Sequence, residues 1–413
     1  MNPRATLPSG VIASLAFAVL LNYIDRGNLS TAAPLIQDEL KLSSSQIGLL
    51  LSAFFWTYAP CQLLAGWAVH RFDVRIVLAV GVALWSVATL LTGFVTAFAA
   101  LLLLRLLLGL GESVTFPGVQ LLLARHTHER QRGTLMGLIT MGQGVGPMCG
   151  TLFGGLLMAQ FGWRALFITL GAITLLWLLP WLYATRSGSI PIHVEEHGSG
   201  VSYAAVLRRR DFWGTALGHF GANYAFYFII SWLPTFLVKF AGFSVAEMAT
   251  IGAVIYAIYS ASVALTGAAS DAWVRRGASI TLVRKTFMLT SMAGAALTIA
   301  GCAYVEPRNA IWLLFLAGVF FGFATPMIFA IGATLAGPRA AGRWAGAQNL
   351  AGQVAGIVAP LITGFVVDRT GGFGWAFVIS AAVPVLGAFA WGVVLRRIEP
   401  LDWEPAAVAA RSD

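Results

Sequence analysis

The stretch VIASLAFAVLLNYIDRGNLSTAA (residues 11–33) is apolar for long enough to cross a bilayer, yet it carries two adjacent charges, Asp25 and Arg26. The hydrocarbon core of a membrane is spanned by roughly 20 predominantly apolar residues in a helix. A charged side chain at the centre of such a helix costs about 2.5–3.5 kcal/mol, and charges kept at that cost usually line an aqueous pathway. This stretch therefore predicts a membrane protein with a buried polar site.

The apolar character continues along the whole chain. Hydrophobic residues make up 58% of the 413 residues and charged residues only 10%, whereas soluble domains carry about 25% charged residues. Proline, glycine and charged residues divide the chain into apolar segments, each long enough to span a membrane. We expect an all-α protein with twelve transmembrane helices at residues 11–33, 46–69, 74–96, 98–124, 131–159, 163–184, 211–238, 246–273, 281–304, 309–336, 340–367 and 373–397.

The distribution of basic residues predicts the topology. If the N-terminus lies inside, most of the 26 lysines and arginines fall in cytoplasmic loops and tails, as the positive-inside rule requires. Both termini are therefore expected in the cytoplasm, with the lipid bilayer as the surrounding medium. The net charge of +9 is scattered over short loops without a nucleic-acid recognition fold, so we expect no nucleic-acid partner.

Two short repeats indicate an internal duplication. GQGVG (142–146) resembles GQVAG (352–356), and QFGWRALFI (160–168) resembles GGFGWAFVI (371–379). Repeats half a chain apart are typical of transporters built from two similar halves, with substrate bound between them. The longest polar stretch, residues 185–210, has the composition of a linker. We expect an N-terminal six-helix bundle (1–184), a cytoplasmic linker (185–210) and a C-terminal six-helix bundle with a short cytoplasmic tail (211–413).

A second pair of charges lies in the fourth span, where Arg105 and Glu112 are two helical turns, about 10.5 Å, apart on one face. Four charges facing lipid would cost about 10 kcal/mol or more, so we expect them to face one another and a cavity. Counting from the span ends places Arg105 level with Asp25 and Arg26, and Glu112 nearer the cytoplasm. Buried ion pairs that only fix helix packing are the structural alternative.

These charges suit proton-coupled transport of an anion. The planar guanidinium of arginine binds a carboxylate through two hydrogen bonds. If an arginine exchanges a protein carboxylate for a substrate carboxylate, the protein group can take up or release a proton. An exchanger that clamps phosphate or a carboxylate between two arginines is the alternative. Neither metal-ligand spacing nor a nucleophile–base set lies within the spans, so we expect no enzyme, no metal and no cofactor apart from protons.

Three segments carry a family resemblance: NYIDRGNLS (22–30), RLLLGLGESVTFPG (105–118) and NYAFYFIISWLPTFLVKFAGFS (223–244). They resemble the anion:cation symporter family of the major facilitator superfamily, which includes bacterial sugar-acid carriers. The resemblance implies the two-bundle fold of that superfamily in a bacterial inner membrane. It also implies import of an organic anion, such as a hexonate, a hexuronate or an aldarate, with protons through alternating access, by a protein that is usually monomeric.

The resemblance also assigns roles to individual positions. Asp25 and Glu112 would be the acids that carry protons. The substrate-binding residues would be Arg26, Arg105, Tyr23, Tyr58, Gln143, Asn349 and Gln353. For the two tyrosines, ordinary interior packing is the alternative, and either Asn349 or Gln353 would face the cavity.

Gating residues would lie in the loop after the second span and in its counterpart in the other half. The superfamily pattern G-x-x-x-D-R-x-G-R-R matches GWAVHRFDVR (66–75) only in part, because His70 replaces the acid while Arg71 is kept. The counterpart GAASDAWVRR (267–276) retains its acid as Asp271. Arg71 and Asp271 are therefore the expected gating residues, and the change at His70 puts the interaction of the first-half loop in doubt.

Overall fold

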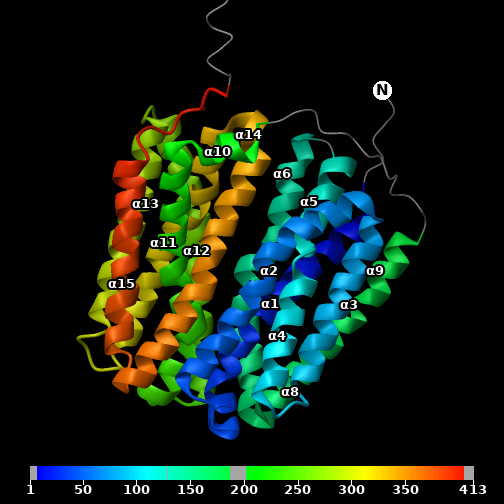
Figure 1. Ribbon diagram of the computed structural model, residues 1–413, viewed down its shortest axis with the longest axis vertical. Coiled ribbons are helices and arrows are strands. Elements are labelled where there is room, and N and C mark those ends of the chain that lie inside the picture. Colours follow the sequence, from blue (N-terminus) through cyan, green and yellow to red (C-terminus); the bar gives the residue numbers. More distant parts are fainter. Residues whose placement is uncertain (1–6, 128, 187–200, 404–413) are drawn as a thin grey trace, which may run out of the picture.

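Long helices fill nearly all of the described chain, which comprises residues 7–127, 129–186 and 201–403 of a computed structural model (Figure 1). Within these residues, eight helical stretches are long and apolar enough to cross a membrane. Two of them are twice the length that a bilayer needs, namely Leu135–Thr185 with 51 residues and Ala310–Thr370 with 61. Each contains one glycine with positive φ, Gly162 at 77° and Gly337 at 59°.

These two glycines separate consecutive spans, because glycine alone enters the left-handed region without steric cost. The helical segments before and after Gly337 pack side by side, since the Gln348 side chain donates a hydrogen bond to the carbonyl of Ile328 at 3.3 Å. Counted in this way, and with α2 and α13 added, the described chain contains twelve membrane-spanning helices. The predicted all-α fold with twelve spans is confirmed.

The first part of the chain forms α1 (Ser9–Leu40), α2 (Ser44–Arg71), α3 (Val74–Thr92), α4 (Phe98–Glu112), α5 (Thr115–His126), α6 (Glu129–Thr140), α7 (Gly142–Cys149), η1 (Gly150–Gly154), α8 (Gly155–Leu176) and α9 (Leu178–Thr185). The predicted fourth span is interrupted just after Glu112, so that it comprises α4 and α5. The first span is longer than predicted, because α1 continues to Leu40.

The second part forms α10 (Tyr203–Leu207), α11 (Arg210–Thr235), η2 (Phe236–Phe240), α12 (Val245–Arg275), α13 (Ile280–Gly301), α14 (Ala310–Thr370), α15 (Gly374–Phe389) and η3 (Ala390–Val394). In Figure 1 the helices of the first half, α1 to α9, gather on one side and those of the second half, α10 to α15, on the other. Most of the predicted linker and part of the tail lie outside the described residues.

Glycines on α7 and η1 set the position of α1. A Cβ atom on Gly146 would lie 2.7 Å from the Cβ of Tyr23, and one on Gly150 would lie 3.2 Å from the Cα of Ile24. Both distances are too short for a larger residue, so the glycines allow α7 and η1 to pack directly on α1. This contact fixes the segment of α1 that carries Tyr23 and Arg26.

The two halves meet firmly at one end of the molecule. The carboxylate of Asp368, at the end of α14, accepts hydrogen bonds from the backbone N–H groups of Ser44 at 2.8 Å and Ser45 at 2.7 Å. It thereby caps the N-terminus of α2 from the opposite half, where the helix dipole favours a negative charge. Lys239 and Asp38 add an ion pair of 2.6 Å between η2 and α1.

We predict that Asp368→Ala favours opening at this end, because it removes two charge-assisted hydrogen bonds, each worth about 1.5–3 kcal/mol. Spin labels at Lys41 and Arg369 should then show a larger population of long distances than in the otherwise unmodified protein. Glu306→Ala, which removes an exposed acid from the loop between α13 and α14, is the control and should leave the distances unchanged. An unchanged distribution in Asp368→Ala would show that the cap does not hold this end closed.

Candidate functional site

A cavity of about 690 Å³ lies between the helices of the two halves, within the size range of small-molecule sites. Every residue predicted to bind substrate lines it, namely Tyr23, Arg26, Tyr58, Arg105, Gln143, Asn349 and Gln353. Its wall reaches Gln120 on α5, Thr140 on α6 and Gly346 on α14. The cavity therefore extends away from the end that Asp368 holds closed.

Arg26 occupies an aromatic cage. Its guanidinium carbon lies 4.8 Å from the ring centroid of Tyr23, 5.0 Å from that of Phe54 and 4.5 Å from that of Tyr58. Each of these contacts is short enough for a cation–π interaction. The cage restrains the guanidinium on several sides and so holds Arg26 in the cavity wall.

The ionic partner of Arg26 is Glu112. Their Nη2 and Oε2 atoms lie 3.1 Å apart, and the Glu112 side chain is fully buried. Among the described residues, neither the second oxygen of Glu112, Oε1, nor Nε of Arg26 has a hydrogen-bond partner. The salt bridge is thus a single contact that leaves an acceptor of Glu112 and a donor of Arg26 unused.

Asp25 and Arg105 lie beside this pair. Asp25 is completely buried and accepts hydrogen bonds from Thr89 at 2.7 Å and Asn28 at 3.1 Å. Arg105 lies over the ring of Phe167, while its Nε and Nη2 atoms, both buried, have no hydrogen-bond partner within the described part of the chain. Arg105 lines the cavity, whereas Asp25 is held behind the wall by helices α1 and α3.

The arrangement of the four charges differs from the predicted ladder. The structure pairs Arg26 with Glu112 across α1 and α4, although we expected Arg26 to lie level with Arg105 and Glu112 to lie deeper. The arginine side chain is long enough to reach along the helix axis, which counting backbone positions does not capture. The expectation that all four charges face the cavity was also too simple, because only the two arginines line it.

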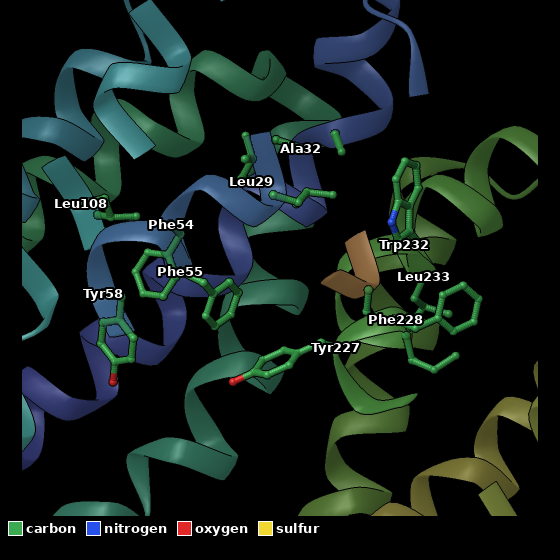
Figure 2. Close-up of a cluster of buried hydrophobic side chains, with 14 of the residues drawn as sticks. Leu29, Ala32, Phe54, Phe55, Tyr58, Leu108, Tyr227, Phe228, Trp232 and Leu233 are labelled. Carbon is green, nitrogen blue, oxygen red and sulfur yellow. The ribbon is translucent and has the colours of Figure 1, made fainter. Parts of the chain in front are cut away.

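The second half contributes neutral polar groups. Gln353 accepts a hydrogen bond from the hydroxyl of Tyr227 at 2.7 Å, and Asn349 donates one to Gln62 on α2 at 3.3 Å. The sequence left open whether Asn349 or Gln353 faces the cavity. In the structure both side chains line it. Figure 2 shows Tyr227 on α11 facing Phe55 and Tyr58 on α2 across the boundary between the halves.

Sequence reasoning missed several residues of the wall. Phe54 completes the cage around Arg26, and Asn223 and His219 on α11 line the cavity one helical turn apart. For Asn223 a signal was present, because it begins the quoted segment at 223–244 and lies four residues before Tyr227, on the same helical face. For Phe54 none was visible, since one aromatic residue in an apolar span has no distinguishing pattern.

The predicted gating residues lie outside the cavity. Arg71 is exposed at the end of α2, and Asp271 is exposed near the end of α12. Neither lines the cavity. Both belong to the end of the molecule toward which the cavity extends, so their gating role stays a prediction.

The altered loop after α2 is held within its own half. Asp73 caps α3 by accepting a hydrogen bond from the backbone N–H of Arg75, and the Arg75 side chain, which also donates to Asp73, holds the pKa of that carboxyl below its usual range. Arg75 also donates to the carbonyl of Thr185 on α9 at 3.0 Å. Arg75, whose side chain Asp73 holds in place, thus ties α3 to α9.

Comparison with known proteins agrees with this architecture. The sequence model of the Major Facilitator Superfamily matches residues 15–360 and 277–412, and the chain belongs to this superfamily. It is a membrane transporter and not an enzyme. The probable sulfoacetate transporter SauU of Cupriavidus necator is 31% identical over 94% of each chain, and the hexuronate transporter of Bacillus subtilis is 28% identical over 97% of each.

The same fold occurs among solved structures. A crystal structure of a bacterial homolog of the human lysosomal transporter Spinster, in an inward-facing and occupied conformation, superposes with a TM-score of 0.81. It covers 96% of this chain and 99% of its own at 21% identity. This likeness confirms the fold, while the resemblance to bacterial sugar-acid carriers is confirmed by the relatives.

We predict that Arg26→Ala destabilises the protein and that adding Glu112→Gln restores part of the loss. Removing one partner of a buried ion pair leaves an uncompensated charge, which costs about 3–5 kcal/mol, whereas removing both charges avoids that cost. Thermal unfolding of wild type, both single variants and the double variant in detergent gives the coupling energy. Purely additive changes in stability would show that the salt bridge is not formed in the folded protein.

Proposed function

We propose that the protein imports an organic anion, a sugar acid such as a hexonate, hexuronate or aldarate, by proton symport through alternating access. One observation carries the proposal: Arg26 and Arg105 line the cavity, whereas their counter-charges Asp25 and Glu112 lie behind its wall. An anion in the cavity meets positive charge first. The transport of sulfoacetate and hexuronate, named for two relatives, supports the same class of substrate.

In the proposed mechanism, proton uptake follows from competition for Arg26. A substrate carboxylate that binds the guanidinium through two hydrogen bonds displaces Glu112, whose existing contact with Arg26 is single. An ionised carboxylate left buried without a partner is costly, so Glu112 takes up a proton. Asp25 is the second proton carrier, because it is buried near the same arginines and its hydrogen-bond partners, Thr89 and Asn28, are neutral.

Release completes the cycle. When the cavity opens to the low-proton side, loss of a proton from Glu112 restores its negative charge, and the carboxylate then competes for Arg26 and expels the substrate. Protein carboxylate and substrate carboxylate thus alternate at one guanidinium. The aromatic cage keeps Arg26 in place throughout, because Tyr23, Phe54 and Tyr58 contact its face and leave its edge to the anion.

The proposed orientation follows the basic loops. Both described ends of the chain lie at the same end of the bundle (Figure 1), and the positive-inside rule assigns that end to the cytoplasm. The cavity then extends toward the cytoplasm and the contacts of Asp368 close the periplasmic side, in the inner membrane of a bacterium. We further propose that the protein acts as a monomer, with protons as its only coupling ion.

We predict accumulation of a sugar acid in proteoliposomes when the inside is made alkaline. The proton gradient drives uptake, and each net charge that crosses 100 mV adds about 2.3 kcal/mol. Uptake is measured with radiolabelled substrate, with and without a proton ionophore. The protein would instead be an exchanger if uptake is the same with and without the pH gradient and the ionophore, and if it requires an anion on the opposite side of the membrane.

We predict that Glu112→Gln retains counterflow and loses uphill uptake. The amide can still contact Arg26 but cannot carry a proton, so loading and reorientation continue without energy coupling. Counterflow and gradient-driven uptake are measured on the same liposomes, with Glu306→Gln in the loop between α13 and α14 as the control. Wild-type accumulation by Glu112→Gln would remove this residue from the coupling step.

A further inference from the structure

The charges of the cavity wall are unevenly distributed. The lysine and arginine side chains among its lining residues are Arg26 and Arg105, and both belong to the first half. The lining residues of the second half include Asn223, Asn349 and Gln353 but no lysine or arginine. A ligand that bridges the halves therefore meets positive charge at one end and neutral polar groups at the other.

Two amides of that neutral wall are oriented by their own hydrogen bonds. The Nδ2 atom of Asn223 donates to the carbonyl of Gly352 at 3.1 Å, and Nδ2 of Asn349 donates to Gln62 at 3.3 Å. In each case the amide nitrogen has a protein partner, whereas no donor from the residues that the structure describes contacts the Oδ1 atom. The wall therefore offers two amide oxygens as hydrogen-bond acceptors.

The position of Asn223 is fixed by close packing between α11 and α14. The ring of His219, one turn earlier on α11, lies against Gly352, where an added Cβ would meet the ring at 2.7 Å. The same glycine supplies the carbonyl that holds Asn223. Because Gly352 allows this close approach, the Asn223 amide is held in the wall by the backbone of α14.

Acceptor oxygens distinguish a hydroxyl group from a carboxylate. A hydroxyl can donate a hydrogen bond to them, whereas an ionised carboxylate can only accept. A second carboxylate at this wall would lose its hydration without gaining a donor or a cation from the two amide oxygens, and such burial is costly. Groups that repel the wrong ligand contribute to specificity as much as groups that attract the right one.

We propose that Asn223 and Asn349 form a hydroxyl-binding subsite. The transported anion is then a hydroxy acid with a single negative group, which narrows the substrates proposed above to hexonates and hexuronates and disfavours the aldarates, the dicarboxylic acids of equal length. This inference rests on the proposed function, since it requires that the cavity binds an organic anion. The names of the relatives do not decide the matter, because hexuronate carries one anionic group and sulfoacetate carries two.

The test compares pairs of acids that differ only at the far end. D-Gluconate and D-glucarate share a six-carbon chain and end in a hydroxymethyl group or a carboxylate, and glycerate and tartronate form the same pair with three carbons. Binding to the purified full-length protein is measured by calorimetry at about pH 8. This pH lies above the ordinary pKa of histidine near 6.5, so that His219, which also lines the cavity, does not add a positive charge to this wall. In any pair that binds, we expect the acid with the hydroxymethyl group to bind at least about tenfold more tightly than the dicarboxylate. A site that hydrogen-bonds a hydroxyl group rejects analogues that lack it.

Asn223→Leu tests the subsite directly. The variant should bind the hydroxymethyl acid about tenfold more weakly than wild type, and its affinity for the dicarboxylate should change less than twofold. Asn309→Leu, in the exposed loop before α14, should change neither affinity. If the wild-type protein binds the dicarboxylate as tightly as the hydroxymethyl acid of the same pair, the proposed subsite is wrong. This comparison does not depend on the folding of any variant. If no small organic acid binds and none is taken up by proteoliposomes, the proposed function itself falls.

Discussion

Arg26 and Glu112 form a salt bridge inside the membrane-spanning bundle, where either charge would be costly to bury without the other. Glu112 is fully buried, and the guanidinium lies among three aromatic rings. If one of the two charges were removed, the other would stay buried in low-dielectric surroundings without a partner, which is energetically costly. Arg26 therefore requires an anion beside it, and Glu112 requires either a cation or a proton. In the proposed mechanism this constraint couples the two fluxes, because a ligand anion that takes the place of Glu112 at Arg26 requires Glu112 to be neutralised.

The fold places that pair on α1 and α4 of the first half, beside the cavity that lies between the two halves. Glycines of α7 and η1 press α1 into position, and Asp368 joins the bundles at one end by capping α2 from α14. At the other end the cavity is lined by residues of α5, α6 and α14. A cavity that is closed at one end and extends toward the other is the geometry that the proposed alternating access requires.

The two halves contribute different chemistry in spite of their internal likeness. Gln143 and Gln353, which occupy corresponding positions of the repeated GQ segments, both line the cavity. Charge is nevertheless confined to the first half of its wall, where Arg26 and Arg105 lie, and neutral amides to the second. In the proposed function, the first half would therefore bind the anionic group and couple transport to protons, while the second half would recognise the uncharged part of the substrate.

The sequence alone determined the twelve spans, because apolar length and glycine punctuation are local properties. The seven wall residues that it predicted followed from the resemblance to a known family. Tertiary structure decided which charge pairs with which, since the Arg26 side chain reaches across to α4 and covers a distance that helical position does not reveal. It also decided that the carboxylates lie behind the arginines, and that Phe54 and Asn223 belong to the wall. Helix rotation controls these features, and rotation follows from packing between helices that are distant in sequence.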